Sequence, residues 1–101
     1  MREVVWSVRA IDQYASAFEF LAERNPAAAD KLRTRVRETL DLLARRPIGR
    51  LGYADGTFEK IIQQTSYLIV FELAGDELRI MRLFHMSQDW RHWHDAETEP
   101  Q

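Results

Sequence analysis

The dipeptide Asn25-Pro26 constrains the fold of this chain most, because it separates two stretches of helical periodicity. Asparagine is a common N-cap residue and proline is tolerated at the first helical position, so a second helix is expected to start there. Ser7 is the predicted N-cap of the first helix, and Arg45-Arg46-Pro47 predicts the end of the second. Apolar residues three and four apart support both helices: Ile11, Tyr14, Ala15, Phe18, Leu21 and Ala22, then Ala29, Leu32, Val36, Leu40 and Leu43. The sequence therefore predicts an antiparallel helical hairpin.

Strand-forming segments lie on both sides of this hairpin. Residues 4–8 are a short β-prone run, and β-branched and aromatic residues enrich residues 57–64, 67–74 and 77–85. Gly75-Asp76 is expected to form a two-residue hairpin turn, since glycine stands first. Residues 48–56 have no helical period and hold three of the four glycines, so a loop is expected there. The order strand, two helices, three strands indicates an α+β domain.

The last predicted strand alternates so that its side chains divide between two faces. Period-two alternation places the even-numbered residues from Leu78 to Phe84 on one face and the odd-numbered residues from Arg79 to His85 on the other. Both faces are partly apolar, so we expect helices on one face and a groove or a partner on the other. Arg82 and His85 fall on opposite faces unless a bulge intervenes.

Length and composition indicate one domain, expected over residues 1–95, with residues 96–101 as a frayed C-terminal tail. A short helical turn is expected to start near Ser87. The absence of cysteine excludes a disulfide scaffold, a thiolate metal site and a cysteine nucleophile. No apolar run approaches the roughly 18 residues that span a membrane, so a cytoplasmic protein with no membrane partner is expected.

The charge is unevenly distributed along the chain. The formal net charge is −2, which argues against nucleic-acid binding through overall basicity. Residues 31–50 nevertheless hold seven basic and two acidic residues, a local charge of +5. This basic stretch is expected either to be a solvated helix face or to receive an acidic partner.

Several short phrases occur in an order and spacing that resemble the RelE/ParE family of toxins, which includes plasmid stabilisation proteins. They are Trp6-Ser7, Asn25-Pro26 with the three alanines after it, Leu42-Leu43 ahead of Pro47, Gly49-Arg50-Leu51-Gly52, Gly56-Thr57 with Glu59, residues 67–71, and residues 80–85 with Gln88-Asp89. The resemblance covers nearly the entire chain. It implies a β-α-α-β-β-β fold in which the helical hairpin packs on a small, mostly antiparallel sheet.

The resemblance also implies the toxin of a type II toxin–antitoxin pair, held inactive by a cognate antitoxin. RelE-like members cut ribosome-bound mRNA without a metal, whereas ParE-like members inhibit DNA gyrase. The ending with His85 and Gln88-Asp89 resembles ParE more than RelE. Phe58 and Gln88 stand where the family often has arginine, which weakens the case for RNA cleavage. A gyrase-binding toxin is therefore the favoured hypothesis, with an mRNA endoribonuclease or a diverged, non-toxic interaction module as alternatives.

RNA cleavage through the 2′-hydroxyl needs a base, an acid and cations that stabilise the crowded phosphate. The candidates for these roles are His85, Arg82, Arg50 and Lys60. The alternative for His85 is a backbone hydrogen bond at the end of the strand.

The expected partners are the antitoxin and gyrase, or the ribosome and mRNA in the alternative, and a homodimer is left open. The candidate partner-binding residues are Arg33, Arg37, Arg50, Phe58, Arg79, Trp90 and Trp93. No cofactor is expected. No metal is expected either, because His92 and His94 would point apart on a helical turn beside Asp89.

Overall fold

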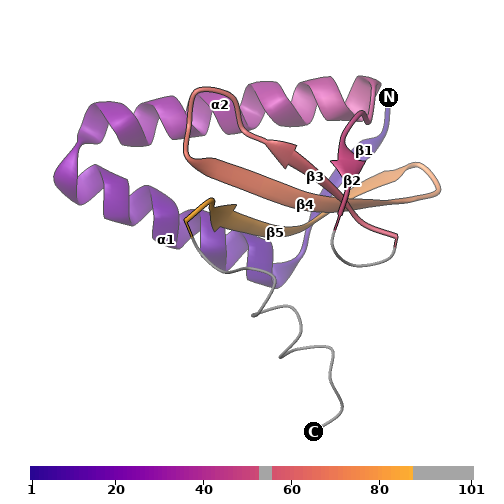
Figure 1. The fold of residues 1–101 in the computed structure, drawn as a ribbon, viewed down its shortest axis with the longest axis horizontal. Coiled ribbons are helices and arrows are strands. Elements are labelled where there is room, and N and C mark those ends of the chain that lie inside the picture. The colour runs from indigo at the N-terminus through magenta and orange to yellow at the C-terminus, as the bar shows by residue number, and fades with distance from the viewer. Residues whose placement is uncertain (53–55, 88–101) are drawn as a thin grey trace, which may run out of the picture.

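The computed structural model describes residues 1–52 and 56–87, which form two helices and a five-stranded sheet (Figure 1). The elements are β1 (Glu3–Trp6), α1 (Val8–Arg24), α2 (Pro26–Arg45), β2 (Arg50–Leu51), β3 (Phe58–Ile61), β4 (Tyr67–Ala74) and β5 (Glu77–His85). The strand order is β1-β5-β4-β3-β2. Only the β1–β5 pair among these strands is parallel, so the predicted α+β fold with a mostly antiparallel sheet is confirmed.

The helical hairpin begins at the two predicted caps. The Ser7 side chain accepts a hydrogen bond from the Ala10 amide at 3.0 Å, and its hydroxyl donates to the Met81 carbonyl at 2.9 Å. Asn25 accepts from the Ala28 amide at 3.3 Å, and Pro26 stands at the first helical position. Ser7 therefore starts α1 and also ties that start to β5, while Asn25 provides the tight connection seen where α1 meets α2 (Figure 1).

The main core lies between the hairpin and one face of the sheet. Most of its fully buried side chains come from α2, β4 and β5, with Ala10 from α1 and Ile62 from the segment after β3, and Trp6 stacks on Tyr14 at 5.4 Å along the β1 side. Members that are at most 3% exposed include Leu32, Val36, Leu43, Ile69, Phe71, Leu78, Ile80 and Leu83. The stripe predicted for the second helix faces the sheet. The stripe predicted for the first helix is wrong for Ile11 and Ala15, which are exposed, whereas Tyr14 and Leu21 do pack on the core. Burial of these apolar side chains provides the main driving force for folding.

A β-bulge in β5 makes the predicted alternation of that strand wrong beyond Ile80. Val70 pairs with Arg82 and Phe71 pairs with Ile80, so Met81 is an extra residue. The bulge turns Leu83 into the core and Phe84 to the other face, where it clusters with Leu68 and Val70. Because the bulge precedes both residues, Arg82 and His85 still lie on opposite faces.

The segment expected to be a loop at residues 48–56 contains the two-residue strand β2, so that expectation is wrong for Arg50 and Leu51. Two glycines allow this close pairing. A Cβ on Gly49 would lie 2.9 Å from the Glu59 carbonyl oxygen, and one on Gly52 would lie 2.3 Å from the Thr57 hydroxyl. Next to this pair, the Gly52 amide donates to the Thr57 carbonyl at 2.8 Å.

None of the helices within the described residues is both long and apolar enough to cross a membrane. The boundary expected at residue 95, the tail at 96–101 and the helical turn expected from Ser87 fall at or beyond the end of the described residues.

Candidate functional site

The face of the sheet turned away from the helices, here called the distal face, carries a row of aligned residues that crosses four strands. In this row Arg50 on β2 pairs with Glu59 on β3, Glu59 pairs with Val70 on β4, and Val70 pairs with Arg82 on β5. The neighbouring row is apolar and consists of Ile61, Leu68 and Phe84. Two arginines and one carboxylate therefore share a line beside an apolar strip.

An ion pair between Arg50 and Glu59 occupies one end of the row. The Arg50 guanidinium donates from Nη2 and Nε to the same Glu59 oxygen, at 3.0 and 3.1 Å. The Glu59 side chain is only 4% exposed, whereas that of Arg50 is 65% exposed. A carboxylate this deeply buried requires such a partner, because desolvation of an unpaired charge is costly.

Arg82 lies at the other end of the row and folds back against its own strand. Its guanidinium donates from Nη1 to the Met81 carbonyl at 2.7 Å, at the bulge. Burial, and to a smaller extent the charge of Arg9, lowers the pKa of Arg82 below its ordinary value. The bulge therefore helps to hold this cation.

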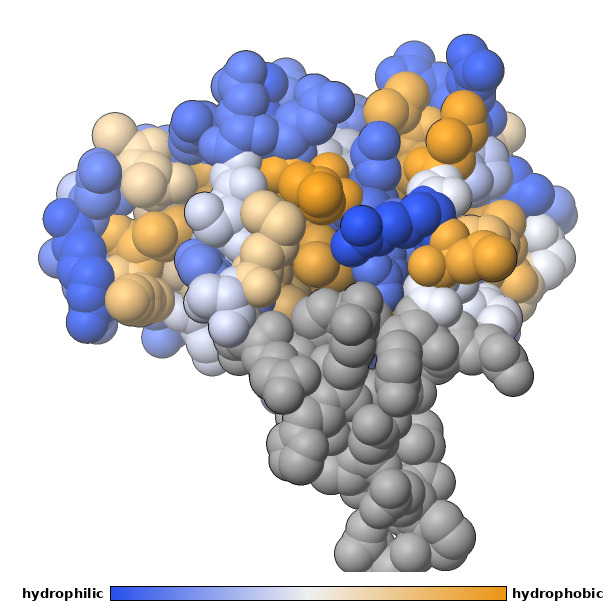
Figure 2. All heavy atoms as spheres, viewed as in Figure 1, coloured by the Kyte–Doolittle hydropathy of each residue, from blue (hydrophilic) through white to orange (hydrophobic). Residues whose placement is uncertain are grey.

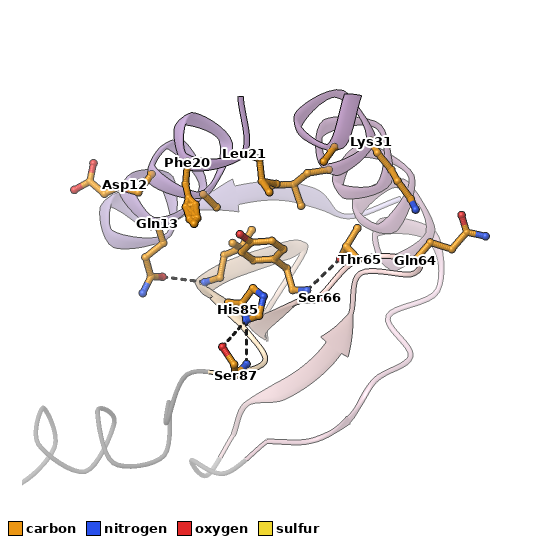
Figure 3. A pocket seen from close by; sticks show the side chains of 16 residues that line it. Asp12, Gln13, Phe20, Leu21, Lys31, Gln64, Thr65, Ser66, His85 and Ser87 are labelled. Carbon is orange, nitrogen blue, oxygen red and sulfur yellow. Dashed lines mark hydrogen bonds between the residues drawn. The ribbon is translucent and has the colours of Figure 1, made fainter. Parts of the chain in front are cut away.

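A pocket of about 790 Å³ opens on the other side of the sheet, between the connected ends of the helices, the β3–β4 turn and the end of β5. Its apolar wall includes Phe20, Leu21 and Leu32, and its polar side includes Lys31 and His85. Figure 3 shows Phe20 and Leu21 pointing from the helix toward the cavity, with His85 on the opposite wall. The pocket thus combines an apolar surface for a side chain with polar groups at its margin.

His85 is held on this wall by local contacts. Its Nδ1 accepts from the Ser87 amide at 3.1 Å and lies 2.7 Å from the Ser87 hydroxyl, as the dashed lines in Figure 3 mark. Its ring meets the ring of Tyr67 edge to face, with 5.1 Å between centroids. Acceptance from the amide makes Nδ1 the unprotonated nitrogen in this arrangement, as expected for a histidine that bonds backbone at a strand end.

The tyrosine beside His85 gives a test of this environment. Burial raises the pKa of Tyr67 above the ordinary value of 10.0. A raised folded-state pKa contributes stability that is fully present below the unfolded value and is lost as the pH rises through the folded one. In a pH titration followed by phenolate absorbance, the part of the signal that is missing in Tyr67→Phe reports Tyr67. We expect the midpoint of this part to lie above pH 10.0. As the pH rises from 10.0 through the folded-state pKa of Tyr67, the free energy of unfolding should fall more steeply for the wild type than for Tyr67→Phe. A midpoint at or below the ordinary value would contradict the burial of this ring.

The four candidate catalytic residues do not converge. Arg50 and Arg82 lie on the distal face, whereas His85 lies in the pocket on the helix side. Lys60 pairs with Ile69, whose side chain is in the main core, so Lys60 shares the helix-side face of the sheet. Within residues 1–52 and 56–87, the sheet itself separates the histidine from both arginines.

The candidate partner-binding residues are distributed over several surfaces. Arg33 pairs with Asp30 at 3.0 Å on α2, and Arg33 and Arg37 lie near Tyr14, where their charges lower a phenol pKa that burial raises more strongly. Figure 2 shows hydrophilic residues gathered along α2, at the top of the view. Arg79 pairs with Glu77 at 2.9 Å and Glu72 at 3.5 Å. Trp90 and Trp93 lie outside the described residues, as do Gln88, Asp89, His92 and His94.

Phe58 faces the core and stacks on Phe71 with 5.5 Å between ring centroids. Its pairing opposite Leu51 places it beside the ion pair but on the other side of the sheet. As a partner-binding residue it stays a prediction.

The sequence did not reveal the roles of Glu59 and Tyr67. Glu59 lies inside a β-prone segment, two residues after a glycine-containing turn, and this position is only a weak signal for a buried carboxylate. The arginine that pairs with it lies nine residues earlier in the sequence. Tyr67 gave no signal, because the pocket brings together residues from α1, α2, the β3–β4 turn and β5.

Comparison with known proteins agrees with this architecture. A chromosomal ParDE toxin–antitoxin system from P. aeruginosa superposes with a TM-score of 0.73 at 19% identity, over 84% of this chain and 96% of that one. The intact E. coli RelBE toxin–antitoxin complex gives a TM-score of 0.57 at 9% identity, over 82% of this chain and 94% of that one. These likenesses show that the chain shares its fold with chains of these two systems.

Sequence comparison is more specific. The family model described as the ParE toxin of the type II toxin–antitoxin system parDE matches residues 4–90. The toxin RelE2 of Caulobacter vibrioides is 28% identical over 89 residues, which cover 87% of this chain and 99% of that protein. The chain belongs to the ParE toxin family of type II toxin–antitoxin systems.

Proposed function

We propose that this toxin is ParE-like in mechanism: it binds and inhibits DNA gyrase, and a cognate antitoxin neutralises it. The observation that carries the proposal is the separation of the candidate catalytic groups. Among the described residues, His85 lies on the helix side of the sheet and the two candidate arginines lie on the distal face. General acid–base catalysis requires the base and the phosphate-binding cations within hydrogen-bond reach of one substrate. The arrangement supports binding to a protein target better than RNA cleavage.

A second candidate is a ribosome-dependent mRNA endoribonuclease. It is favoured by the relative named toxin RelE2 and by the similarity of fold to the toxin in RelBE. In this mechanism Arg50 and Arg82 would bind RNA on the distal face, and the general base would have to come from another group than His85.

Controlled expression in bacteria distinguishes the two mechanisms. A gyrase inhibitor is expected to arrest growth with loss of plasmid supercoiling and induction of the DNA-damage response, while transcripts stay intact. Cleaved transcripts with normal supercoiling would reject the gyrase proposal and support the endoribonuclease.

The antitoxin is proposed to place an apolar side chain in the pocket between the helices and β5. Support comes from the apolar wall of the pocket and from Phe20, which is 46% exposed there. The solved relatives include toxin–antitoxin complexes, which motivates the same kind of partner for this chain. Anchors of this kind dominate the affinity of protein interfaces.

Phe20→Glu tests this contact. The Arg24 guanidinium lies 3.7 Å from the Phe20 ring centroid, so a glutamate can pair with it one turn away and the helix is preserved. We expect the affinity for the antitoxin to fall by about 30-fold or more, the loss typical of a hot spot of about 2 kcal/mol. Ile11→Glu is the matched control, because Ile11 is 51% exposed on the same helix and does not line the pocket. Equal losses for the two variants, measured by calorimetry, would rule out the pocket as the specific anchor.

A further inference from the structure

We propose that Glu59 determines what the distal face can bind: its buried carboxylate occupies Arg50 as an internal counter-ion and thereby excludes nucleic-acid phosphates from this row. The inference rests on the proposed function in one respect, namely that the target of the toxin is a protein.

The geometry of the ion pair supports this role. Two donors of the Arg50 guanidinium converge on one Glu59 oxygen, at 3.0 and 3.1 Å. A phosphate would compete for the same donors, since arginine binds carboxylates and phosphates through the same fork of N–H groups. Arg50 is exposed enough for a ligand to reach it, but two of its N–H groups already donate to Glu59.

Burial makes the competition unequal. The Glu59 side chain is 4% exposed, so it cannot exchange Arg50 for water when a phosphate approaches. A phosphate that took Arg50 would deprive a buried carboxylate of two hydrogen bonds, and it would also be repelled by that negative charge. Both effects oppose phosphate binding at this end of the row.

The position of Glu59 extends its effect along the row. Glu59 pairs with Val70, and Val70 pairs with Arg82, so the carboxylate lies between the two arginines. The row carries two positive charges and one negative charge. Replacement of Glu59 by an isosteric neutral residue would leave the row with two positive charges and no negative one, and the exposed Arg50 guanidinium would then be available to a phosphate of a single-stranded nucleic acid.

The test compares purified wild type, Glu59→Gln and Glu72→Gln in binding to a fluorescent single-stranded RNA oligonucleotide over a series of salt concentrations. Glutamine keeps one side-chain oxygen that can accept from Arg50, removes the negative charge and has an NH2 group in place of the second carboxylate oxygen. Glu72→Gln is the matched control, because it makes the same change in charge at a carboxylate on the neighbouring strand that pairs with Arg79 at 3.5 Å. Circular dichroism and urea unfolding verify that each variant is folded.

Glu59→Gln is expected to bind RNA about 10-fold more tightly than the wild type at low salt. The dependence of log K on log salt should steepen by about 0.7 for one gained phosphate contact, and Arg50→Gln in the same chain should abolish the gain. Glu72→Gln should stay close to the wild type. Equal gains for the two glutamine variants, or no gain for either, would overturn the inference.

A second variant serves if Glu59→Gln does not fold. In the otherwise wild-type chain, Arg50→Gln should leave the weak RNA affinity unchanged, because Arg50 is already occupied. A loss of about 10-fold would show that phosphate reaches Arg50 in the wild type, and the inference would be wrong.

Supercoiling assays on the same samples separate this inference from the proposed function. If the wild type inhibits gyrase and Glu59→Gln gains no RNA affinity, only the role of Glu59 fails. If the wild type leaves gyrase unaffected but Glu59→Gln gains RNA affinity, the role of Glu59 stands and the gyrase target fails.

Discussion

Replacing Leu43 by alanine is expected to lower the free energy of unfolding by about 2–5 kcal/mol, because it removes a fully buried side chain from the centre of the core. Leu43 is 0% exposed and lies on α2 against the sheet. Domains of this size have a total stability of only about 5–15 kcal/mol, so the loss is a large part of the whole. Urea unfolding followed by circular dichroism measures the change.

The adjacent leucine provides the matched control. Leu42 is 46% exposed, so Leu42→Ala makes the same chemical change one residue away on the outer side of α2. It is expected to change the free energy of unfolding by less than about 1 kcal/mol. Similar losses for the two variants would mean that the orientation of α2 on the sheet is incorrect.

Replacing Arg50 by alanine is expected to destabilise the domain by about 1–3 kcal/mol. Removal of one partner from a fully buried ion pair typically costs about 3–5 kcal/mol, but the Arg50 side chain is 65% exposed, so its loss in the variant opens a path for water to Glu59 that the wild type does not have. The loss falls on Glu59, which would lose both hydrogen bonds from Arg50. Thermal and urea unfolding at neutral pH measure it.

Arg79→Ala is the control for this change, because Arg79 pairs with Glu72 and Glu77 at an exposed site of the same sheet. Exposed pairs contribute little, so its effect on stability should be close to the error of the measurement. If Arg50→Ala is as mild as Arg79→Ala, Glu59 does not depend on Arg50 for its burial.

The sequence predicted the elements that depend on local signals. Ser7 and Asn25-Pro26 cap the helices as expected, since capping depends on the residue at one position and the amides just after it. Gly75 has a φ of +59°, the left-handed region in which glycine is favoured, so the turn between β4 and β5 was also recognisable. The bounds of β4 and β5 agree with the predicted ranges 67–74 and 77–85.

The features that were missed depend on contacts between distant segments. The bulge at Met81 left no trace in the pattern, because Met81, Leu83 and Phe84 are all apolar and either phase of alternation satisfies the sequence. The strand β2 is only two residues long, too short for any periodicity. The buried state of Glu59 depends on its pairing with Arg50 and Val70 from other strands.

The candidate site was predicted as a set of residues but not as an arrangement. His85 and Arg82 were correctly expected on opposite faces. The bulge, however, places Arg82 on the face opposite to Leu78 and Ile80, and His85 on the same face as these two residues. One fold can therefore carry the same types of residue in arrangements with different chemistry, and function has to be argued from the site. In this toxin the charge of Glu59 beside Arg50 is the feature that most separates the distal face from a phosphate-binding surface.

The most direct test of the gyrase mechanism is a side-by-side assay with the purified toxin. DNA gyrase supercoils relaxed plasmid in one reaction, and ribosomes translate a defined mRNA in the other. The gyrase mechanism predicts that the toxin blocks supercoiling, that its antitoxin restores supercoiling, and that ribosome-bound mRNA stays intact. Normal supercoiling together with cleavage of the ribosome-bound mRNA would contradict it.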